Sequence, residues 1–207
     1  MQLVLTKTSG WGGRRAGAGR KRNPKRRSVD HLTRARVTRH TPVHVTMRVL
    51  PEVWTLRTKR AFRVLRSAMS AASDRLGLRL CDFSVQGNHL HLVVEAENTR
   101  SLSRGMQGLS VRIARALNRL MGRRGKVLAD RFHSHVLRTP REVAHALHYV
   151  RYNDDKHRLR RGHVVISIPD EYSSIHPFHE VALAAARSYL LQQAHLQQGP
   201  PPVLPDW

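Results

Sequence analysis

Two histidines and a downstream tyrosine and asparagine are the residues best suited to phosphate chemistry. His89 and His91 flank a single leucine, and because side chains alternate faces along a strand, both imidazoles would point the same way and could share one metal ion. Tyr149 and Asn153 lie four residues apart in a segment with helical character, so they would project from one helix face. The phenol supplies a nucleophile and the amide a third ligand, which leaves coordination positions open, as a catalytic site requires.

Rival residues of the same types lie nearby. The chain holds 14 histidines, and His133 and His135 form a second His-X-His pair, which we expect to contact solvent or phosphate rather than to line the site. Tyr152 is one helical turn from Tyr149, and a tyrosine is more often a packing or interface residue than a nucleophile. The ordered set of histidine pair, tyrosine and amide therefore carries more weight than either motif alone.

The sequence around these residues resembles a known family. The segments FSVQGNHLHLVVEA, RGMQGLSVRIARALNRLMGRRGKVLADRFH and RTPREVAHALHYVRYNDDKH resemble, in this order, the single-tyrosine HUH transposases, especially the bacterial group associated with repetitive extragenic palindromes (REP). HUH denotes histidine, bulky hydrophobe, histidine, which residues 89–91 match. The family pattern also has an amide four residues after its nucleophile, which selects Tyr149 with Asn153. The resemblance covers roughly residues 40–160.

The resemblance implies a transposase that acts on single-stranded or hairpin DNA. It implies Mg²⁺ or Mn²⁺ held by His89, His91 and Asn153, and attack by the Tyr149 hydroxyl on a scissile phosphate. The product is a 5′-phosphotyrosine, which another 3′ end can resolve in strand transfer. The resemblance further implies a homodimer in which the tyrosine helix is sometimes donated by the partner, so placement in cis or in trans stays open.

Composition points independently to a polyanionic partner. The 37 Lys and Arg against 14 Asp and Glu give a formal net charge of +23 and a pI of about 11.8. No apolar run approaches the ~20 residues that span a bilayer, so nucleic acid is favoured over a membrane. The single Cys81 excludes an intramolecular disulfide and fits a reducing compartment, so we expect a cytoplasmic protein.

Residues 1–40 are predicted to form a flexible basic arm. They hold 12 Lys and Arg, one acidic residue and five glycines, and cannot assemble an apolar core. Part of the arm resembles the Arg-Gly arms that enter DNA minor grooves, and nonspecific attraction to phosphates is the simpler alternative. The candidate DNA-binding residues here are Arg14, Arg15, Arg20, Lys21 and Arg22.

The elements that would position the site begin near Thr41. We predict strands over 43–50, 78–86, 89–96 and 127–138, and helices over 57–77, over 101–121 and from Thr139 through the tyrosine segment. The first helix would end at Gly77 and bury Phe62, Leu65, Met69 and Leu76. The second would carry a candidate phosphate track of Arg112, Arg115 and Arg119, for which a plain solvated face is the alternative.

This order predicts an α+β fold, the ferredoxin-like split βαβ arrangement with an antiparallel sheet, of the HUH endonuclease type with an extra tyrosine-bearing helix. The first and third strands would be central. If Leu90 and Leu92 face the two helices, the paired histidines face the open side, which the extra helix or a partner must cover. The predicted domains are the arm (1–40), the endonuclease domain (41–160) and an extension (161–207) with one helix over 180–197 and a proline-rich tail.

Two other functions remain alternatives to a metal-dependent endonuclease. One is a non-catalytic, ferredoxin-like nucleic-acid-binding protein derived from a transposase. The other is a zinc-stabilised domain, which would need a fourth ligand such as Cys81 or His135. Retention of both histidines, the tyrosine and the amide favours the enzyme.

Overall fold

The computed structural model describes residues 35–160, 170–176, 183–194 and 196, with the backbone alone over 153–160. The arm residues Arg14, Arg15, Arg20, Lys21 and Arg22 lie outside this range. Val37 is already buried in the core, and Thr38 forms a β-bridge with Asn98. The packed part of the chain therefore includes residues just ahead of Thr41.

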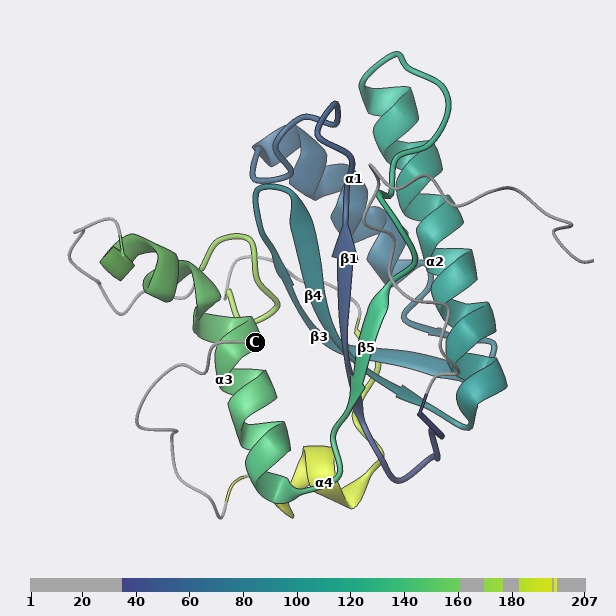
Figure 1. The fold of residues 1–207 in the computed structure, drawn as a ribbon, viewed down its shortest axis with the longest axis vertical. Helices are drawn as coiled ribbons and strands as arrows, with labels where there is room; N and C mark the ends of the chain where they lie inside the picture. Colours follow the sequence, from purple (N-terminus) through teal and green to yellow (C-terminus); the bar gives the residue numbers. More distant parts are fainter. Residues whose placement is uncertain (1–34, 161–169, 177–182, 195, 197–207) are drawn as a thin grey trace, which may run out of the picture. The chain divides into compact units, whose positions relative to one another are not determined.

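A five-stranded antiparallel sheet carries the site (Figure 1). Its strands are β1 (Val43–Arg48), β2 (Asp74–Arg75), β3 (Leu78–Val85), β4 (His89–Ala96) and β5 (His133–Val136), in the order β2-β3-β4-β1-β5. β1 and β4 are central, as predicted, and β2 is a short extension at one edge. With helices after β1 and β4, this is the ferredoxin-like arrangement, so the predicted fold class is confirmed.

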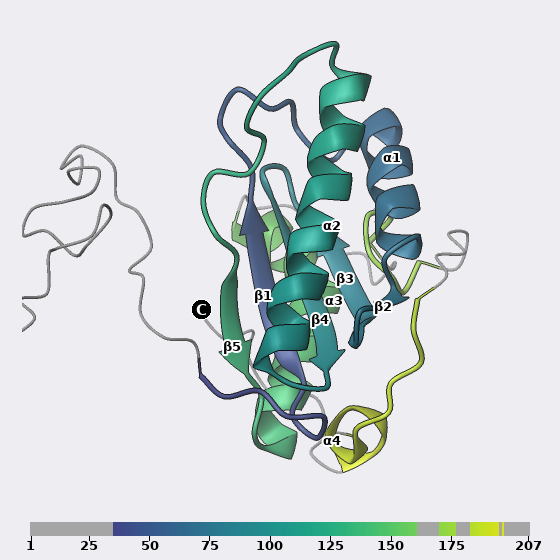
Figure 2. The same cartoon turned by 90° about the vertical axis from the view of Figure 1, so that its right-hand side faces the viewer.

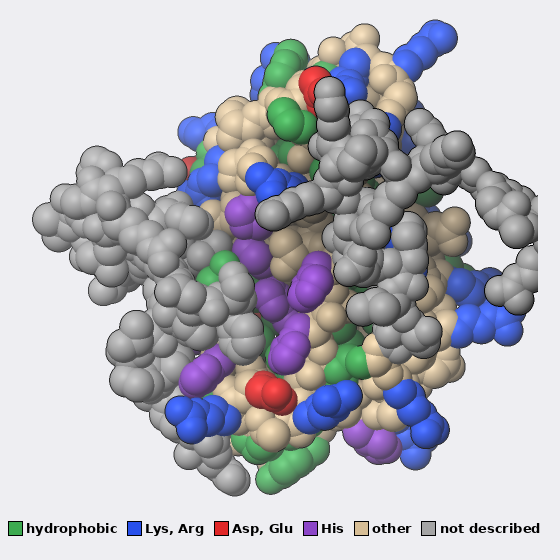
Figure 3. All heavy atoms as spheres, in the orientation of Figure 1, with side chains coloured by type: hydrophobic (Ala, Val, Ile, Leu, Met, Phe, Trp, Pro, Cys, Tyr) green, Lys and Arg blue, Asp and Glu red, His purple; other side chains and the backbone are tan. Residues whose placement is uncertain are grey.

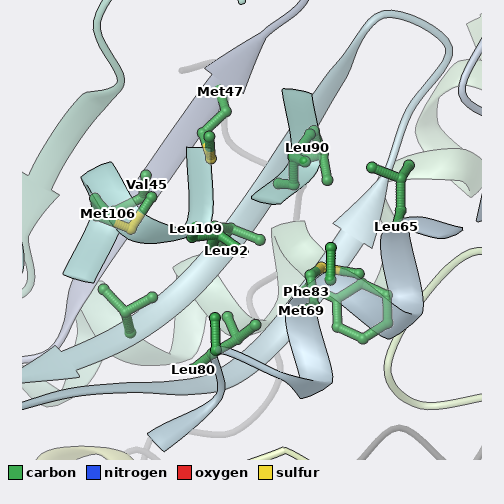
Figure 4. Packing of buried hydrophobic residues seen from close by; sticks show 14 of the residues in the cluster. Val45, Met47, Leu65, Met69, Leu80, Phe83, Leu90, Leu92, Met106 and Leu109 are labelled. Carbon is green, nitrogen blue, oxygen red and sulfur yellow. The ribbon is translucent and has the colours of Figure 1, made fainter. Parts of the chain in front are cut away.

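Helices cover both faces of the sheet (Figure 2). α1 (Lys59–Ser70) and α2 (Thr99–Leu120) lie on one face, and α3 (Pro140–Arg160) lies on the other. Leu90 and Leu92 of β4 pack with Val45 of β1 and Met106 of α2 in the larger hydrophobic cluster (Figure 4). Because side chains alternate along a strand, the histidines of β4 face α3. None of the described helices is long and apolar enough to cross a membrane.

The first helix is shorter than the sequence predicts. Its buried face is as expected at Phe62, Leu65 and Met69. It ends at Ser70, however, and Leu76, which we expected to be buried, is 49 % exposed between β2 and β3. Leu76 and Gly77 both have positive φ, 57° and 71°, which is the conformation that a two-residue hairpin requires. The chain reverses there, so Gly77 ends a turn and not a helix.

The second helix lies where it was predicted, within two residues at each end, and it packs very close to the sheet. The Asn98 side chain caps it by accepting a hydrogen bond from the Ser101 amide at 2.9 Å. At Gly105 a Cβ atom would lie 2.4 Å from the Cβ atom of Leu78, so only glycine permits this contact between α2 and β3.

The fourth predicted strand, 127–138, is a strand only over His133–Val136. The residues before it form an isolated bridge between Val49 and Leu128. The following helix starts as predicted, with a capping box: Thr139 Oγ1 accepts from the Glu142 amide at 3.2 Å, and Glu142 Oε2 accepts from the Thr139 amide at 3.0 Å.

The predicted helix over 180–197 is wrong where the structure describes it, because only α4 (Tyr189–Gln192) is α-helical there. The Ala184 amide instead donates to the Leu80 carbonyl at 2.9 Å. The Glu95 carboxylate accepts from the amides of Arg187 and Ser188 at 2.9 and 2.8 Å. These long-range bonds to β3 and β4 use the amide groups that a longer helix would have paired internally.

Candidate active site

Histidine side chains gather on the face of the sheet where β4, β1 and β5 run side by side (Figure 3). His91 of β4 is paired with Thr46 of β1, which is also paired with His133 of β5. Side chains of paired residues lie on the same face. The side chains of His91, Thr46 and His133, together with Tyr149 of α3, border a cavity of about 490 Å³. Its lining residues are His44, Thr46, Arg48, Asn88, His89, His91, His133, His135 and Tyr149.

The two predicted metal-binding imidazoles lie side by side. The ring centroids of His89 and His91 are 4.7 Å apart, with perpendicular planes. His89 Nδ1 donates to Asn88 Oδ1 at 2.7 Å, because an amide oxygen only accepts. His91 Nδ1 lies 3.3 Å from Thr46 Oγ1 and 3.2 Å from His44 Nε2. Both rings thus use Nδ1 for contacts within the protein, as metal-binding histidines do when Nε2 is the ligand atom.

His44 is a residue of the cavity that the sequence motifs did not reveal. Its ring stacks on that of His91, with centroids 5.3 Å apart, and meets the Tyr149 ring at 6.0 Å. Burial, and then the charges of His135 and His133, lower the pKa of His44 from 6.5 to about 4. The ring is therefore neutral at neutral pH and can accept a hydrogen bond from His91. Only the pairing of β1 with β4 and β5 brings it here.

The structure distinguishes the two rival tyrosines. Tyr149 lines the cavity, and its ring meets that of His91 edge-on, with centroids 5.0 Å apart. Tyr152 is 41 % exposed and lies against His148, at 4.9 Å between centroids, outside the cavity lining. The geometry therefore favours Tyr149 as the candidate nucleophile.

Polar and apolar contacts hold α3 over the sheet. Arg151 Nε donates to Asp82 Oδ2 of β3 at 2.8 Å, and the Ser174 hydroxyl donates to the other oxygen of the same buried carboxylate. Leu147 and Val150 pack with Val93 of β4 in the second hydrophobic cluster. In this structure the tyrosine helix therefore covers the histidines of its own chain.

The helix that carries Tyr149 is interrupted. Tyr152 has non-helical dihedral angles, φ −119° and ψ 17°, so a kink separates Tyr149 from Asn153. The uninterrupted helix on which the four-residue spacing depends is therefore not present. The Asn153 side chain lies outside the described part of the chain.

The second histidine pair lies in the cavity, and our expectation that it would stay apart from the site is wrong. His133 and His135 line the cavity from β5. His135 Nε2 lies 3.8 Å from Glu142 Oε1 at the start of α3. The hydrogen-bonding pattern of β5 with β1, which the spacing of the motifs does not contain, brings the two pairs together.

The predicted arginine track lies on α2, across the sheet from the histidines. Arg112 and Arg115 line a cavity of about 480 Å³ together with Arg75 and Arg104, whereas Arg119 lies outside it. A cavity of about 630 Å³ lies between the other side of α2 and residues 125–132, and none of the predicted site residues lines it.

No set of three or more His, Cys, Asp or Glu side chains within the described residues is arranged to hold a metal ion. Cys81, the suggested zinc ligand, packs against the second hydrophobic cluster and does not line the histidine cavity. Burial, and then the nearby Glu95 charge, raise the pKa of its thiol to about 12. The structure thus offers no four-ligand zinc site in the part it describes, and a cation at His89 and His91 would need oxygen ligands.

No protein-family model matches this sequence, and no curated protein matches it. Solved structures similar to this chain include two transposases. One is a REP-associated tyrosine transposase bound to a REP hairpin, with 16 % sequence identity and a TM-score of 0.51, covering 62 % of this chain and 74 % of that chain. The other is a candidate transposase from Deinococcus radiodurans R1, with 12 % identity and a TM-score of 0.42, covering 65 % of this chain and 100 % of that one. This chain therefore shares the α+β fold of a tyrosine transposase.

Proposed function

We propose that this protein is a transposase-type enzyme that cleaves and rejoins single-stranded DNA through a covalent phosphotyrosine. The observation that carries the proposal is the position of Tyr149, whose ring lies 5.0 Å from that of His91 in a cavity that His89 also lines. A nucleophile beside two imidazoles that can share a divalent cation suits phosphoryl transfer to a side chain. The fold shared with a tyrosine transposase supports the same conclusion.

His89 and His91 fit a divalent cation, since each uses Nδ1 for contacts with neighbouring side chains. We assign Mn²⁺ or Mg²⁺ to them, with oxygen ligands from the Asn153 amide, the DNA phosphate and water. When bound, such a cation polarises the scissile phosphate and neutralises the charge that develops on it.

Side chains of the cavity carry the remaining chemistry. The Tyr149 hydroxyl attacks phosphorus, the bond to the 3′ oxygen breaks, and the 5′ phosphate becomes esterified to tyrosine. A phenol has a pKa near 10, so it is a better leaving group than an alkoxide and the intermediate stays reactive toward a new 3′ hydroxyl. Arg48, paired with His89 across β1 and β4, adds a positive charge for the non-bridging phosphate oxygens.

Basic residues outside the cavity would bind the DNA backbone. The formal net charge of +23 far exceeds the charge of the residues that line the cavity, and this excess supports a polyanionic substrate. Within this proposal, Arg112 and Arg115 bind phosphates together with Arg75 and Arg104, and the arm residues add further contacts. The substrate is single-stranded or hairpin DNA at palindromic repeats, and the active form is a homodimer.

An adduct assay tests the proposal. The protein is incubated with end-labelled single-stranded hairpin DNA and Mg²⁺ or Mn²⁺, and denaturing gels are searched for a covalent protein–DNA species. We expect an adduct with the wild type and with the matched control Tyr152→Phe, and none with Tyr149→Phe, whose DNA affinity stays close to that of the wild type. Loss of the adduct with Tyr152→Phe instead would move the nucleophile. DNA binding by a wild type that forms no adduct would identify a non-catalytic binding protein.

A further inference from the structure

The two ends of the histidine cavity differ. α3 packs on β3 and β4, so Tyr149 approaches from that side, and β5 forms the opposite wall (Figure 1). Neighbouring strands are ~4.8 Å apart, so His133 on β5 lies two strands, or about 10 Å, from His91 in backbone position. The cavity thus extends from the candidate nucleophile to a second pair of imidazoles, for which the proposed reaction so far has no role.

The stereochemistry of phosphoryl transfer places the nucleophile at one end of the cavity and the leaving group at the other. The attacking and leaving oxygens lie roughly in line, on opposite sides of phosphorus. If Tyr149 attacks a phosphate held at His89 and His91, the leaving 3′ oxygen points toward β1 and β5. Without a proton it would depart as an alkoxide, a poor leaving group because its conjugate acid is about as weak as water, with a pKa of about 16. A proton donor on the β5 side would lower this barrier.

We infer that His133 is this donor and transfers its proton to the 3′ oxygen as the bond to phosphorus breaks; the inference rests on the proposed function. His133 lies in the same cross-strand row as His91, with Thr46 between them. It lines the cavity and is exposed to solvent, so a DNA strand can reach it. His135 is less suited, because its Nε2 faces Glu142 at 3.8 Å, a carboxylate already used in capping α3.

The step balances without another reactant. Tyr149 releases its proton to solvent as its oxygen bonds to phosphorus. The electron pair of the broken bond stays on the 3′ oxygen, which takes the proton of His133, and solvent reprotonates the imidazole. In strand transfer the reverse applies, and neutral His133 accepts the proton of the incoming 3′ hydroxyl. The titratable and charged side chains that share the cavity with it are His44, Arg48, His89, His91, His135 and Tyr149.

A substrate with sulfur in place of the bridging 3′ oxygen at the mapped cleavage position tests this role. A thiol has a pKa of about 8.5, so a thiolate leaves without being protonated. We expect His133→Gln to slow single-turnover adduct formation on the oxygen substrate by about a hundredfold or more, the usual contribution of a general acid. On the sulfur substrate the same variant should form the adduct as fast as the wild type does. DNA affinity should be unchanged on both.

His135→Gln is the matched control, since it changes the same side chain on the same strand and face. We expect it to change the rate of adduct formation by the same factor on both substrates. If His133→Gln slows both substrates equally, or slows neither, His133 is not the proton donor. A defect of His135→Gln that sulfur suppresses would assign the role to His135 and overturn ours. Failure of the proposed function looks different, because the wild type would then form no adduct with either substrate.

Discussion

Each histidine of the cavity is distinguished by what its ring contacts. His89 uses Nδ1 toward Asn88, and His91 uses Nδ1 toward Thr46 and His44, as histidines that bind a cation through Nε2 do. His44 is buried and neutral at neutral pH, so it supports His91 without adding charge beside it. His133, in contrast, is exposed at the far wall. Burial and hydrogen bonding therefore give the histidines of this cavity three different environments.

Glycines of α2 allow a matched test of packing at the residue scale. A Cβ atom at Gly105 would lie 2.4 Å from Leu78 Cβ, so we expect Gly105→Ala to lower the free energy of unfolding by roughly 1–3 kcal/mol. Gly108 has nothing within 4 Å of such an atom, so Gly108→Ala should raise it by roughly 0.5–1 kcal/mol through helix propensity. Urea denaturation measures both. A Gly105→Ala variant as stable as the wild type would show that α2 can shift away from β3.

Glu95 should make stability depend on pH. Burial by itself raises the pKa of its carboxyl, but hydrogen bonds from the Ser188 side chain, Arg79 and the amides of Ser188 and Arg187 outweigh it and lower the pKa below 4.5. A lowered pKa in the folded state means that this stabilisation is complete above pH 4.5 and is lost as pH falls through the folded-state value. We expect Glu95→Gln to cost roughly 3–5 kcal/mol at neutral pH, because it leaves Arg79 without its charge partner.

Urea denaturation of Glu95→Gln and the wild type across this pH range checks the expectation. The difference between the two proteins should shrink as the medium becomes more acidic. Glu97→Gln, at an exposed carboxylate just beyond β4, is the control and should cost little. A constant difference at all pH values would mean that packing, and not the charge of Glu95, stabilises the segment before α4.

At the scale of elements, the ion pair between Arg151 of α3 and Asp82 of β3 helps to place α3. Arg151→Ala would leave the Asp82 side chain, which is 4 % exposed, with the Ser174 hydroxyl but without a cation. We expect a loss of roughly 2–3 kcal/mol, below the usual cost of breaking a fully buried pair because the Arg151 side chain is 38 % exposed. The amides of α3 should exchange with deuterium faster, and adduct formation by Tyr149 should slow.

Arg141→Ala, at an exposed position of the same helix, is the control and should change neither quantity. If amide exchange in α3 is as slow in Arg151→Ala as in the wild type, the apolar contacts with Val93 hold the helix without help from the ion pair.

For the whole molecule, the proposed function predicts that charge governs how DNA is bound. The histidine cavity and the arginine-lined cavity beside α2 belong to opposite faces of the sheet. If the arginines beside α2 bind DNA as proposed, binding energy is spread over surfaces that take no part in the chemistry, and substitutions in the histidine cavity should change cleavage more than affinity.

The arm can be tested within the full-length chain. Replacing Arg14, Arg15, Arg20, Lys21 and Arg22 by alanine removes five positive charges but none of the candidate catalytic groups. For single strands, the slope of log affinity against log salt should fall by about 0.7 for each phosphate that the arm no longer neutralises, and so by at most about 3.5. Titrations at several salt concentrations measure this slope. An unchanged slope would mean that these side chains do not touch the DNA.

The sequence by itself determined the features that depend on local periodicity. Alternation along residues 89–96 separates the histidines from the core leucines, and the Thr139 capping box starts the tyrosine helix where predicted. The order of strands and helices was enough for the fold class. Local sequence signals failed where distant groups compete for backbone hydrogen bonds. The segment before α4 has high helical propensity, but its amides donate to Glu95 and to the Leu80 carbonyl, so the helix is short.

Only the tertiary structure decided which histidines meet. His44, His91 and His133 lie on three strands, and the register that aligns them depends on hydrogen bonds between residues far apart in the chain. The same holds for Tyr149, which an ion pair and apolar contacts bring to His91 even though the helix kinks three residues later. Motif spacing describes neighbours along the chain, whereas this site is assembled across the sheet, where strand pairing and packing set the distances.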